Sequence, residues 1–243
     1  MSSAATIAIP MASMPSPIHA LSLDLGPQTI SYDAPTVFVV DDDIYIQQAL
    51  ELLIRSQGWQ PRIYDSAQEF LAQPRSVVPS CLILAFSSTG PNGLEVQKRL
   101  AKECATIPII IIADYEDIPT TVQAMRAGAA DFFLKPCSDG LLMTAIRQGL
   151  ARSRAALDRG VEIRGLRNCY ASLTPREQQV MALVAAGLPN KLVGGELGIS
   201  EITVKAHRGQ VMQKMKADSF AHLVNIESRL RLTRSLTPSA VLA

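Results

Sequence analysis

The sequence lacks features on which several classes of protein depend. Its cysteines, Cys81, Cys104, Cys137 and Cys169, form no Cys-x-x-Cys pair, and its three histidines are scattered, so metal-ligand spacing is absent. No apolar run reaches the roughly 18 residues that cross a membrane. No Lys or Arg precedes Arg55, so a secretory leader would lack its positive amino end. We therefore expect a cytoplasmic protein with reduced thiols and no membrane partner.

A strong charge of either sign is also lacking overall, but not locally. The formal net charge is +1. Residues 1–34 carry −2, residues 35–150 carry −4, and residues 151–243 carry +7. A chain of 243 residues most naturally forms two domains. The basic carboxy-terminal third suits a phosphate-bearing partner, whereas the acidic middle does not.

The first two thirds of the chain change character at Thr36. Residues 1–34 are rich in Ser, Ala and Pro, which predicts a disordered tail. From Thr36 onward, five short apolar runs alternate with five helical patterns, so we expect an α/β fold with a five-stranded, parallel, doubly wound sheet. The expected strands are 37–40, 60–64, 81–84, 109–112 and 132–134, and the expected helices lie near 44–57, 66–73, 92–104, 117–127 and from 138 onward.

The functional crevice of such a sheet lies at the carboxyl ends of its strands. The residues at those ends therefore carry the most information. Asp41 and Asp42 follow the first strand, Ala85 follows the third, Ala113 and Asp114 follow the fourth, and Lys135 follows the fifth.

The last third of the chain predicts a set of helices over residues 172–234. Thr174 and Glu177 form a capping box at the start of the first helix. Asn190 is expected to cap a second, short helix, and Ser200 a third that runs to about Lys216. Two short helices joined by a tight glycine turn predict a helix-turn-helix, whose second member enters the DNA major groove.

Helical periodicity divides the third helix into two faces. Val204, Val211 and Met215 fall on one side and should pack inward. A lysine flanked by very small side chains occupies the other side, which lets the backbone approach base edges, and basic residues flank it. The alternative is an ordinary amphipathic helix with a solvated basic face. The expected DNA-binding residues are Thr203, Lys205, Ala206, His207, Arg208, Gly209, Lys214 and Lys216.

Two stretches resemble known families. The run from Leu173 through Leu197-Gly-Ile-Ser and Thr203-Val-Lys-Ala-His resembles a LuxR-type DNA-binding domain of the FixJ-like branch. Val39-Val-Asp-Asp-Asp, Ala124-Met-Arg-Ala-Gly-Ala-Ala-Asp-Phe and Leu134-Lys-Pro resemble a two-component receiver domain. Together the resemblances cover roughly residues 35–230. They imply a response regulator that binds double-stranded promoter DNA as a homodimer, with a fourth helix after the recognition helix contributing to dimerisation.

The sequence departs from the receiver pattern where the chemistry should occur. Leu84-Ala-Phe-Ser-Ser-Thr-Gly-Pro-Asn-Gly places Ala85 at the phosphoacceptor aspartate, and Ala113 replaces the hydroxyl residue that would bind the phosphoryl group. Asp41, Asp42 and Lys135 remain. They either form inherited ion pairs or retain weak Mg²⁺ binding at the two aspartates. The aromatic switch position of the family corresponds to Phe132.

A second departure lies in the DNA-binding region. Gly194 and Gly195 stand where the LuxR-type branch usually has small alanine-like residues. Two glycines inside a helix cost roughly 1–2 kcal/mol of stability, so we expect a soft second helix.

These observations predict five segments and a regulatory function. The segments are a disordered tail at 1–34, a degenerate receiver at 35–150, a helical linker at 151–171 weakened by Gly160 and Gly165, the DNA-binding domain at 172–234, and a tail at 235–243. We expect a non-enzymatic, sequence-specific transcription regulator that Ala85 makes independent of phosphorylation. One alternative is an interaction protein whose pseudo-receiver titrates a kinase or another regulator. A phosphotransfer protein is a second alternative, against which Ala85 argues directly. A protein or small-molecule input at the receiver remains open.

Overall fold

The structure is a computed structural model that describes residues 34–73, 77–86, 93–114 and 118–235. The segment 87–92, which contains Gly90, lies outside the described residues. So do the two expected tails, except for residues 34 and 235. No helix within the described ranges is both long and apolar enough to cross a membrane.

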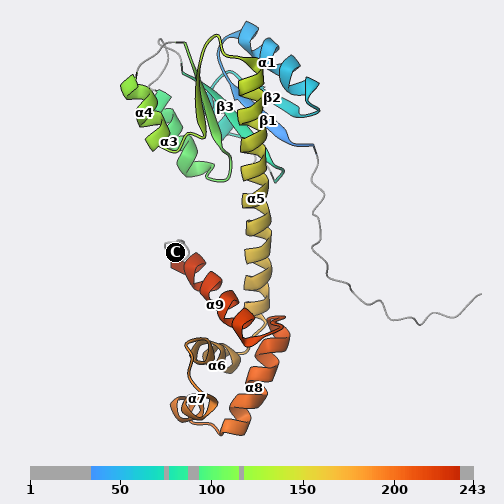
Figure 1. The fold of residues 1–243 in the computed structure, drawn as a ribbon, viewed down its shortest axis with the longest axis vertical. Coiled ribbons are helices and arrows are strands. Elements are labelled where there is room, and N and C mark those ends of the chain that lie inside the picture. The colour runs from blue at the N-terminus through green and yellow to red at the C-terminus, as the bar shows by residue number, and fades with distance from the viewer. Residues whose placement is uncertain (1–33, 74–76, 87–92, 115–117, 236–243) are drawn as a thin grey trace, which may run out of the picture. The chain divides into compact units, whose positions relative to one another are not determined.

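A five-stranded parallel sheet forms the first domain, as the alternating pattern predicted (Figure 1). The strand order is β2-β1-β3-β4-β5. Because all strands are parallel, the residues that follow β1, β4 and β5 lie at one edge, beside the end of β3. The strands are β1 (Thr36–Val40), β2 (Gln60–Tyr64), β3 (Ser80–Phe86), β4 (Ile109–Ala113) and β5 (Asp131–Leu134).

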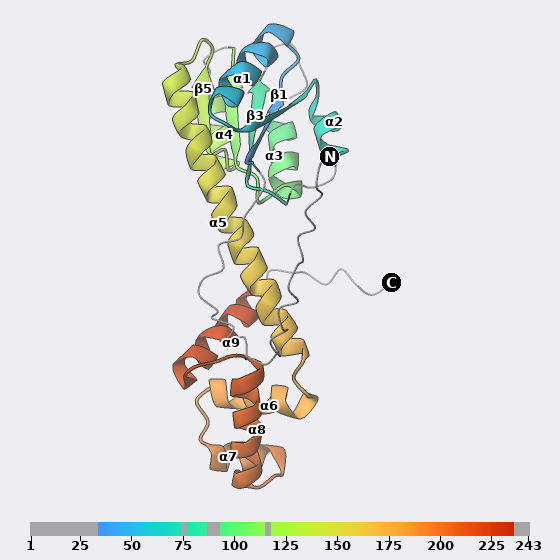
Figure 2. The ribbon, with the colours of Figure 1, turned by 90° about the vertical axis from the view of Figure 1, so that its right-hand side faces the viewer.

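Helices cover both faces of this sheet, and alternate strand residues point into two separate cores. One core includes Phe38, Leu82 and Ile111 with side chains of α2 (Ala67–Leu71), α3 (Gly93–Glu103) and α4 (Ile118–Arg126). The other includes Val39, Ile83 and Ile110 with side chains of α1 (Ile44–Ser56) and α5 (Asp139–Ala171). Figure 2 shows the same domain turned by 90°. The central strands are therefore apolar on both sides, as the continuous hydrophobic runs predicted.

Two contacts fix the position of α5 on the sheet. Gly149 lies so close to β3 that a Cβ atom there would be 2.8 Å from the Sγ atom of Cys81. One turn later, the buried Ser153 hydroxyl accepts a 3.1 Å hydrogen bond from the backbone N–H of Ser80. The polar residue Ser153, which interrupts the apolar periodicity of α5, thus satisfies the first N–H of β3.

The linker is helical as expected, because α5 continues as one helix from Asp139 to Ala171, through Gly160 and Gly165. Its last turns place Leu166, Cys169 and Tyr170 against the core of the second domain. An ion pair between Glu162 and Arg229 joins α5 to α9. These contacts offset the conformational cost of Gly160 and Gly165.

Four helices form the second domain: α6 (Pro175–Ala185), α7 (Asn190–Leu197), α8 (Glu201–Lys214) and α9 (Phe220–Ser235). The capping box of Thr174 and Glu177 is present, and Ser200 caps α8 by accepting from the Thr203 N–H. Asn190 does not cap α7, because the extended residue before the helix is Pro189 and Asn190 lies in its first turn. Gly198, at φ 65°, ends α7 in the left-handed region.

Candidate functional site

Lys135 is the centre of the carboxyl-edge pocket, by which we mean Asp41, Asp42, Ala85, Ala113 and Lys135. The Lys135 Nζ atom lies 3.1 Å from an Asp41 carboxylate oxygen and 3.0 Å from one of Asp114. Burial alone would lower the pKa of Lys135. Its hydrogen bonds to Asp114 and Asp41 outweigh that cost and raise the pKa above its ordinary value. Lys135 is therefore held protonated between two carboxylates.

The other oxygen of Asp41 is also occupied, since it accepts a 2.9 Å hydrogen bond from the Asp43 N–H. Asp43 in turn caps α1 by accepting from the N–H groups of Tyr45 and Ile46. Asp42 is exposed. The sequence predicted that Lys135 would pair with Asp41 or Asp42. The structure pairs it with Asp41 and also with Asp114. Asp114 lies in the loop after β4, where no periodicity reports its direction.

Apolar side chains occupy the positions between these charges. Ala85 lies inside β3, with its methyl group beside a cavity of about 110 Å³ that Asp41, Asp42 and Asp65 also line. Ala113 ends β4 and is buried. Neither side chain can donate or accept a hydrogen bond, so neither can hold a phosphoryl group or a metal ion.

These residues do not fit a Mg²⁺ ion. Both Asp41 oxygens are already engaged, and a methyl group stands where a third carboxylate would be needed. Within the described parts of the chain, no three Asp, Glu, His or Cys side chains gather closely enough to hold a metal ion.

Phe132, on β5, is half-buried and packs against Phe86. The two ring centroids are 6.5 Å apart and the ring planes are nearly perpendicular. A Cβ atom at Gly93 would be 2.8 Å from the Phe86 ring, so the absence of a side chain at Gly93 leaves room for it. Phe132 thus belongs to a packed aromatic contact on the α3–α4 side of the sheet.

In the second domain, α8 divides as its periodicity predicted. Val204, Val211 and Met215 are almost fully buried. They pack in two cores, Val204 with α6 and α7, and the other two with α6 and α9. The opposite face exposes Thr203, Lys205, Ala206 and Gly209, while His207 is half-buried.

The turn between α7 and α8 explains one of the two unusual glycines. A Cβ atom at Gly194 would be 2.7 Å from the carbonyl oxygen of Ile199, whose N–H bonds back to the Gly194 carbonyl at 3.0 Å. The backbone of the turn thus packs directly on Gly194. Gly195 is exposed, and a Cβ atom there would meet nothing within 4 Å. Of the two glycines, Gly194 is therefore required by the packing of the turn, whereas Gly195 has room for a side chain.

Arg208 is held by two neighbouring helices. One of its guanidinium nitrogens donates to the Asn190 side-chain oxygen on α7, at 3.4 Å. Its guanidinium carbon lies 4.8 Å from the centre of the Phe220 ring on α9. The sequence predicted a flanking residue that reaches phosphate. The structure adds contacts that fix where its guanidinium lies.

Lys214 has a structural partner rather than a free ammonium group. Its Nζ atom lies 2.7 and 2.9 Å from the two carboxylate oxygens of Glu177, the buried residue of the α6 capping box. This contact directs the Lys214 ammonium group toward α6, and a contact between Lys214 and DNA phosphate stays a prediction. Lys216 is exposed just beyond α8, at φ 53°.

The two domains match two families. Residues 37–147 match the response regulator receiver domain, and residues 171–226 match the bacterial regulatory proteins of the luxR family. Nodulation protein W of Bradyrhizobium diazoefficiens is 42% identical over 212 residues, which are 87% of this chain and 93% of that protein. The chain belongs to the response regulators that join a receiver domain to a LuxR-type DNA-binding domain.

Other relatives in this response regulator family agree. Transcriptional regulatory protein FixJ of Rhizobium meliloti is 36% identical over 207 residues, covering 84% of this chain and 98% of that protein. Among solved structures, the response regulator StyR is 42% identical with a TM-score of 0.70, covering 81% of this chain and 100% of StyR. The carboxyl-edge pocket is thus the receiver pocket, and α8 is the helix of the LuxR-type domain that is expected to enter DNA.

Proposed function

We propose that this response regulator is a sequence-specific transcription regulator that binds promoter DNA as a homodimer and is not switched by aspartyl phosphate. Ala85 is the observation that carries the proposal, because a methyl group cannot attack phosphorus. A cytoplasmic location follows from DNA as the partner. We further propose that the chain is not an enzyme and holds no cofactor.

The surroundings of Ala85 support independence from phosphate. Moving a receiver from mostly inactive to mostly active takes roughly 5.5 kcal/mol of differential binding. A phosphoryl group would need a point of attachment, a hydroxyl donor and a cation. Ala85 and Ala113 remove the first two, and Lys135 is already bound to Asp41 and Asp114. A phosphate mimic would therefore gain little binding free energy in this pocket, and so it could not favour one conformation strongly over another.

Beryllofluoride tests this part of the proposal. We expect the affinity of the full chain for its DNA target to be unchanged when beryllofluoride and Mg²⁺ are added. Ala85→Asp is the matched control. It should permit modification by a phosphoryl donor, with little change in DNA binding, because Ala113 still offers no hydroxyl. A several-fold gain in affinity of the unmodified chain would contradict the proposal.

Lys205 is the residue proposed to read bases. It lies on the exposed face of α8 beside Ala206 and Gly209, whose small side chains allow close approach to the groove. Lys205→Ala should cost roughly 1–3 kcal/mol on the specific site and less on random DNA. Lys98→Ala is the control, because it removes the same charge from an exposed lysine on α3 of the receiver. Equal losses on both DNA sequences would reduce Lys205 to a phosphate contact.

Arg208 is proposed to contact phosphate from a fixed position. Arg208→Ala should weaken binding to specific and random DNA alike, because phosphates carry no sequence information. Binding of the unmodified chain should also fall steeply with salt. Phe220→Leu keeps the Arg208 charge but removes the ring beneath it. A loss of DNA affinity in that variant would show that the Phe220 ring positions the Arg208 guanidinium for its phosphate contact.

The receiver offers a surface for the proposed dimer. Ile118, Val122 and Met125 are spaced along one face of α4, and each is substantially exposed. We propose that this face pairs with a second copy without any phosphoryl donor. Sedimentation of the full chain should show a dimer at micromolar concentration, and Val122→Asp should shift it toward monomer. A strictly monomeric wild-type chain would contradict this.

A further inference from the structure

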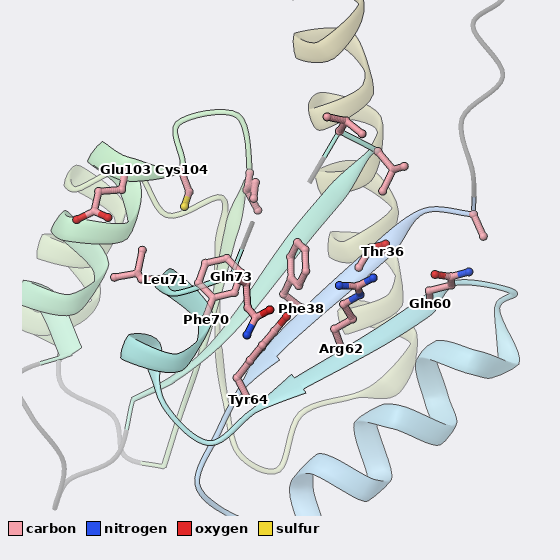
Figure 3. A pocket seen from close by; sticks show the side chains of 14 residues that line it. Thr36, Phe38, Gln60, Arg62, Tyr64, Phe70, Leu71, Gln73, Glu103 and Cys104 are labelled. Carbon is pink, nitrogen blue, oxygen red and sulfur yellow. The ribbon is translucent and has the colours of Figure 1, made fainter. Parts of the chain in front are cut away.

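A second hollow lies on the receiver, away from the carboxyl-edge pocket. The helix α2 is only five residues long, so it covers little of the sheet beside the edge strand β2. A cavity of about 330 Å³ remains between β1, β2, α2 and the carboxyl end of α3 (Figure 3). That volume falls in the range of roughly 300–1,000 Å³ that is usual for small-molecule sites.

Three aromatic rings form the floor of this hollow. Phe38 of β1, Tyr64 of β2 and Phe70 of α2 have centroids 5.1–6.2 Å apart, and each residue is more than nine-tenths buried. Leu71 and Ile107 extend the apolar surface. Rings held against one another in this way form a rigid surface on which a flat apolar group can pack.

The register of β2 places a cation over this floor. Residues of a strand alternate in direction, so Gln60, Arg62 and Tyr64 share one face, and Arg62 pairs in register with Phe38. Arg62 is exposed, lines the hollow, and has no hydrogen-bond or ion-pair partner among the described residues. Figure 3 shows Arg62 and Gln60 along β2, beside the aromatic rings.

The Tyr64 hydroxyl is a second polar group without a hydrogen-bond partner in the described parts of the chain. The hydroxyl oxygen is not fully buried, because Gln97 Oε1 is the one fully buried side-chain polar atom without a partner among the described residues. It is therefore accessible at the hollow that Tyr64 lines. Among the described residues, Glu103 is the one acid that lines the hollow, and it is already paired with Arg99 at 2.9 Å. The uncompensated charge that these described residues bring to the hollow is therefore positive.

We infer that this hollow binds a small, planar organic carboxylate. The flat apolar body would pack on Phe38, Tyr64 and Phe70, and the carboxylate would pair with the Arg62 guanidinium. Arginine presents a rigid fork that matches a carboxylate. A cation would meet Arg62 unfavourably, and a small inorganic anion would leave the aromatic floor unused. The inference concerns binding alone, so it stands or falls independently of the proposed DNA binding.

Benzoate is the probe, titrated against the full chain without DNA and followed by NMR or calorimetry. We expect saturable binding of benzoate, and at least tenfold weaker binding of benzamide, which has the same shape without the charge. Arg62→Gln should weaken benzoate binding at least tenfold, and Arg62→Lys by less. Tyr64→Phe should weaken it severalfold. Arg126→Gln, an exposed arginine on α4, should leave it unchanged.

Because Arg62 is exposed and has no partner among the described residues, its variants should fold normally, which circular dichroism can verify. The inference is overturned if benzoate does not bind, if benzamide binds equally well, or if Arg62→Gln matches the wild-type affinity. Equal losses in the Arg62 and Arg126 variants would also overturn it, since they would indicate a general effect of charge.

Discussion

Replacing Lys214 by methionine should loosen the DNA-binding domain rather than merely weaken its grip on DNA. Methionine keeps most of the side-chain length but removes the ammonium group from between α6 and α8. The Glu177 carboxylate, only 6% exposed, then loses both of its short contacts to Lys214. Its remaining hydrogen bond comes from the Thr174 N–H, at 2.8 Å.

The expected cost follows from the burial of each partner. Removing one partner of a buried ion pair costs roughly 3–5 kcal/mol, because the other charge stays buried and uncompensated. The Lys214 side chain is 32% exposed, so water can partly replace it. We therefore expect a loss of about 1.5–3 kcal/mol. Glu177→Gln is the matched control. Glutamine also completes a capping box, and the lysine left behind can reach water, so this variant should cost less.

The pH dependence gives an independent check. The hydrogen bond from Lys214, and then that from the Thr174 N–H, lower the pKa of Glu177 below its ordinary value. A lowered pKa contributes stability above the pKa of the unfolded chain, and this contribution is lost as the pH falls through the folded value. The wild-type domain should therefore lose stability below roughly pH 4. Lys214→Met lacks most of this contribution, so the two proteins should converge there.

Hydrogen exchange of the full chain provides the measurement, because it reports α6 and α8 separately from the receiver. At neutral pH, a loss of 1.5–3 kcal/mol corresponds to roughly 10- to 150-fold less protection in these helices. Unchanged protection, together with reduced affinity for specific and random DNA, would refute the reasoning. Lys214 would then be a phosphate contact, as its place on the flank of the recognition helix suggested.

Three further outcomes test the packing. Gly195→Ala should raise the stability of the DNA-binding domain by about 0.5–1 kcal/mol. Gly194→Ala should not, because a Cβ atom at residue 194 would be 2.7 Å from the Ile199 carbonyl oxygen. Equal melting temperatures of the two variants would contradict this. Ser153→Ala removes the hydroxyl that accepts from the buried Ser80 N–H and should cost about 1–3 kcal/mol in urea unfolding of the receiver. Cys81 should resist iodoacetamide at pH 8 in the folded chain, because burial raises the pKa of its thiol to about 12. It should react once the chain is unfolded in urea. If mass spectrometry finds Cys81 modified as fast as the partly exposed Cys104 and Cys169, its burial is disproved.

Local patterns allowed most of the backbone to be predicted. The apolar runs located all five strands, since a doubly wound sheet buries both faces of each central strand. The capping pairs of Thr174 with Glu177 and Ser200 with Thr203 located the starts of α6 and α8. Such signals act within a few residues, so they survive in the sequence whatever the tertiary contacts are.

Contacts between distant elements were harder to predict. Periodicity placed Lys214 on the flank of α8, but it could not show that Glu177 lies opposite, 37 residues earlier. The place of Asp114 after β4 put it at the carboxyl edge of the sheet, but its contact with Lys135 could not be predicted, because no periodicity fixes the direction of a loop side chain. The hollow beside β2 depends on how little of the sheet α2 covers, and so on three-dimensional packing alone.

The same packing bears on how a signal could act in this receiver. The resemblance to receiver domains predicts that Phe132 is the aromatic switch, and in this structure it packs edge-on against Phe86. Moving Phe132 would disrupt that contact, and Ala113 has no hydroxyl that could form a hydrogen bond to stabilise the moved state. An input must favour one arrangement of the chain over another by several kcal/mol. If phosphate does not act at the carboxyl edge, as we propose, such an input acts through contacts elsewhere. Two surfaces of the described receiver on which to look for it are the aromatic hollow beside Arg62 and the exposed face of α4.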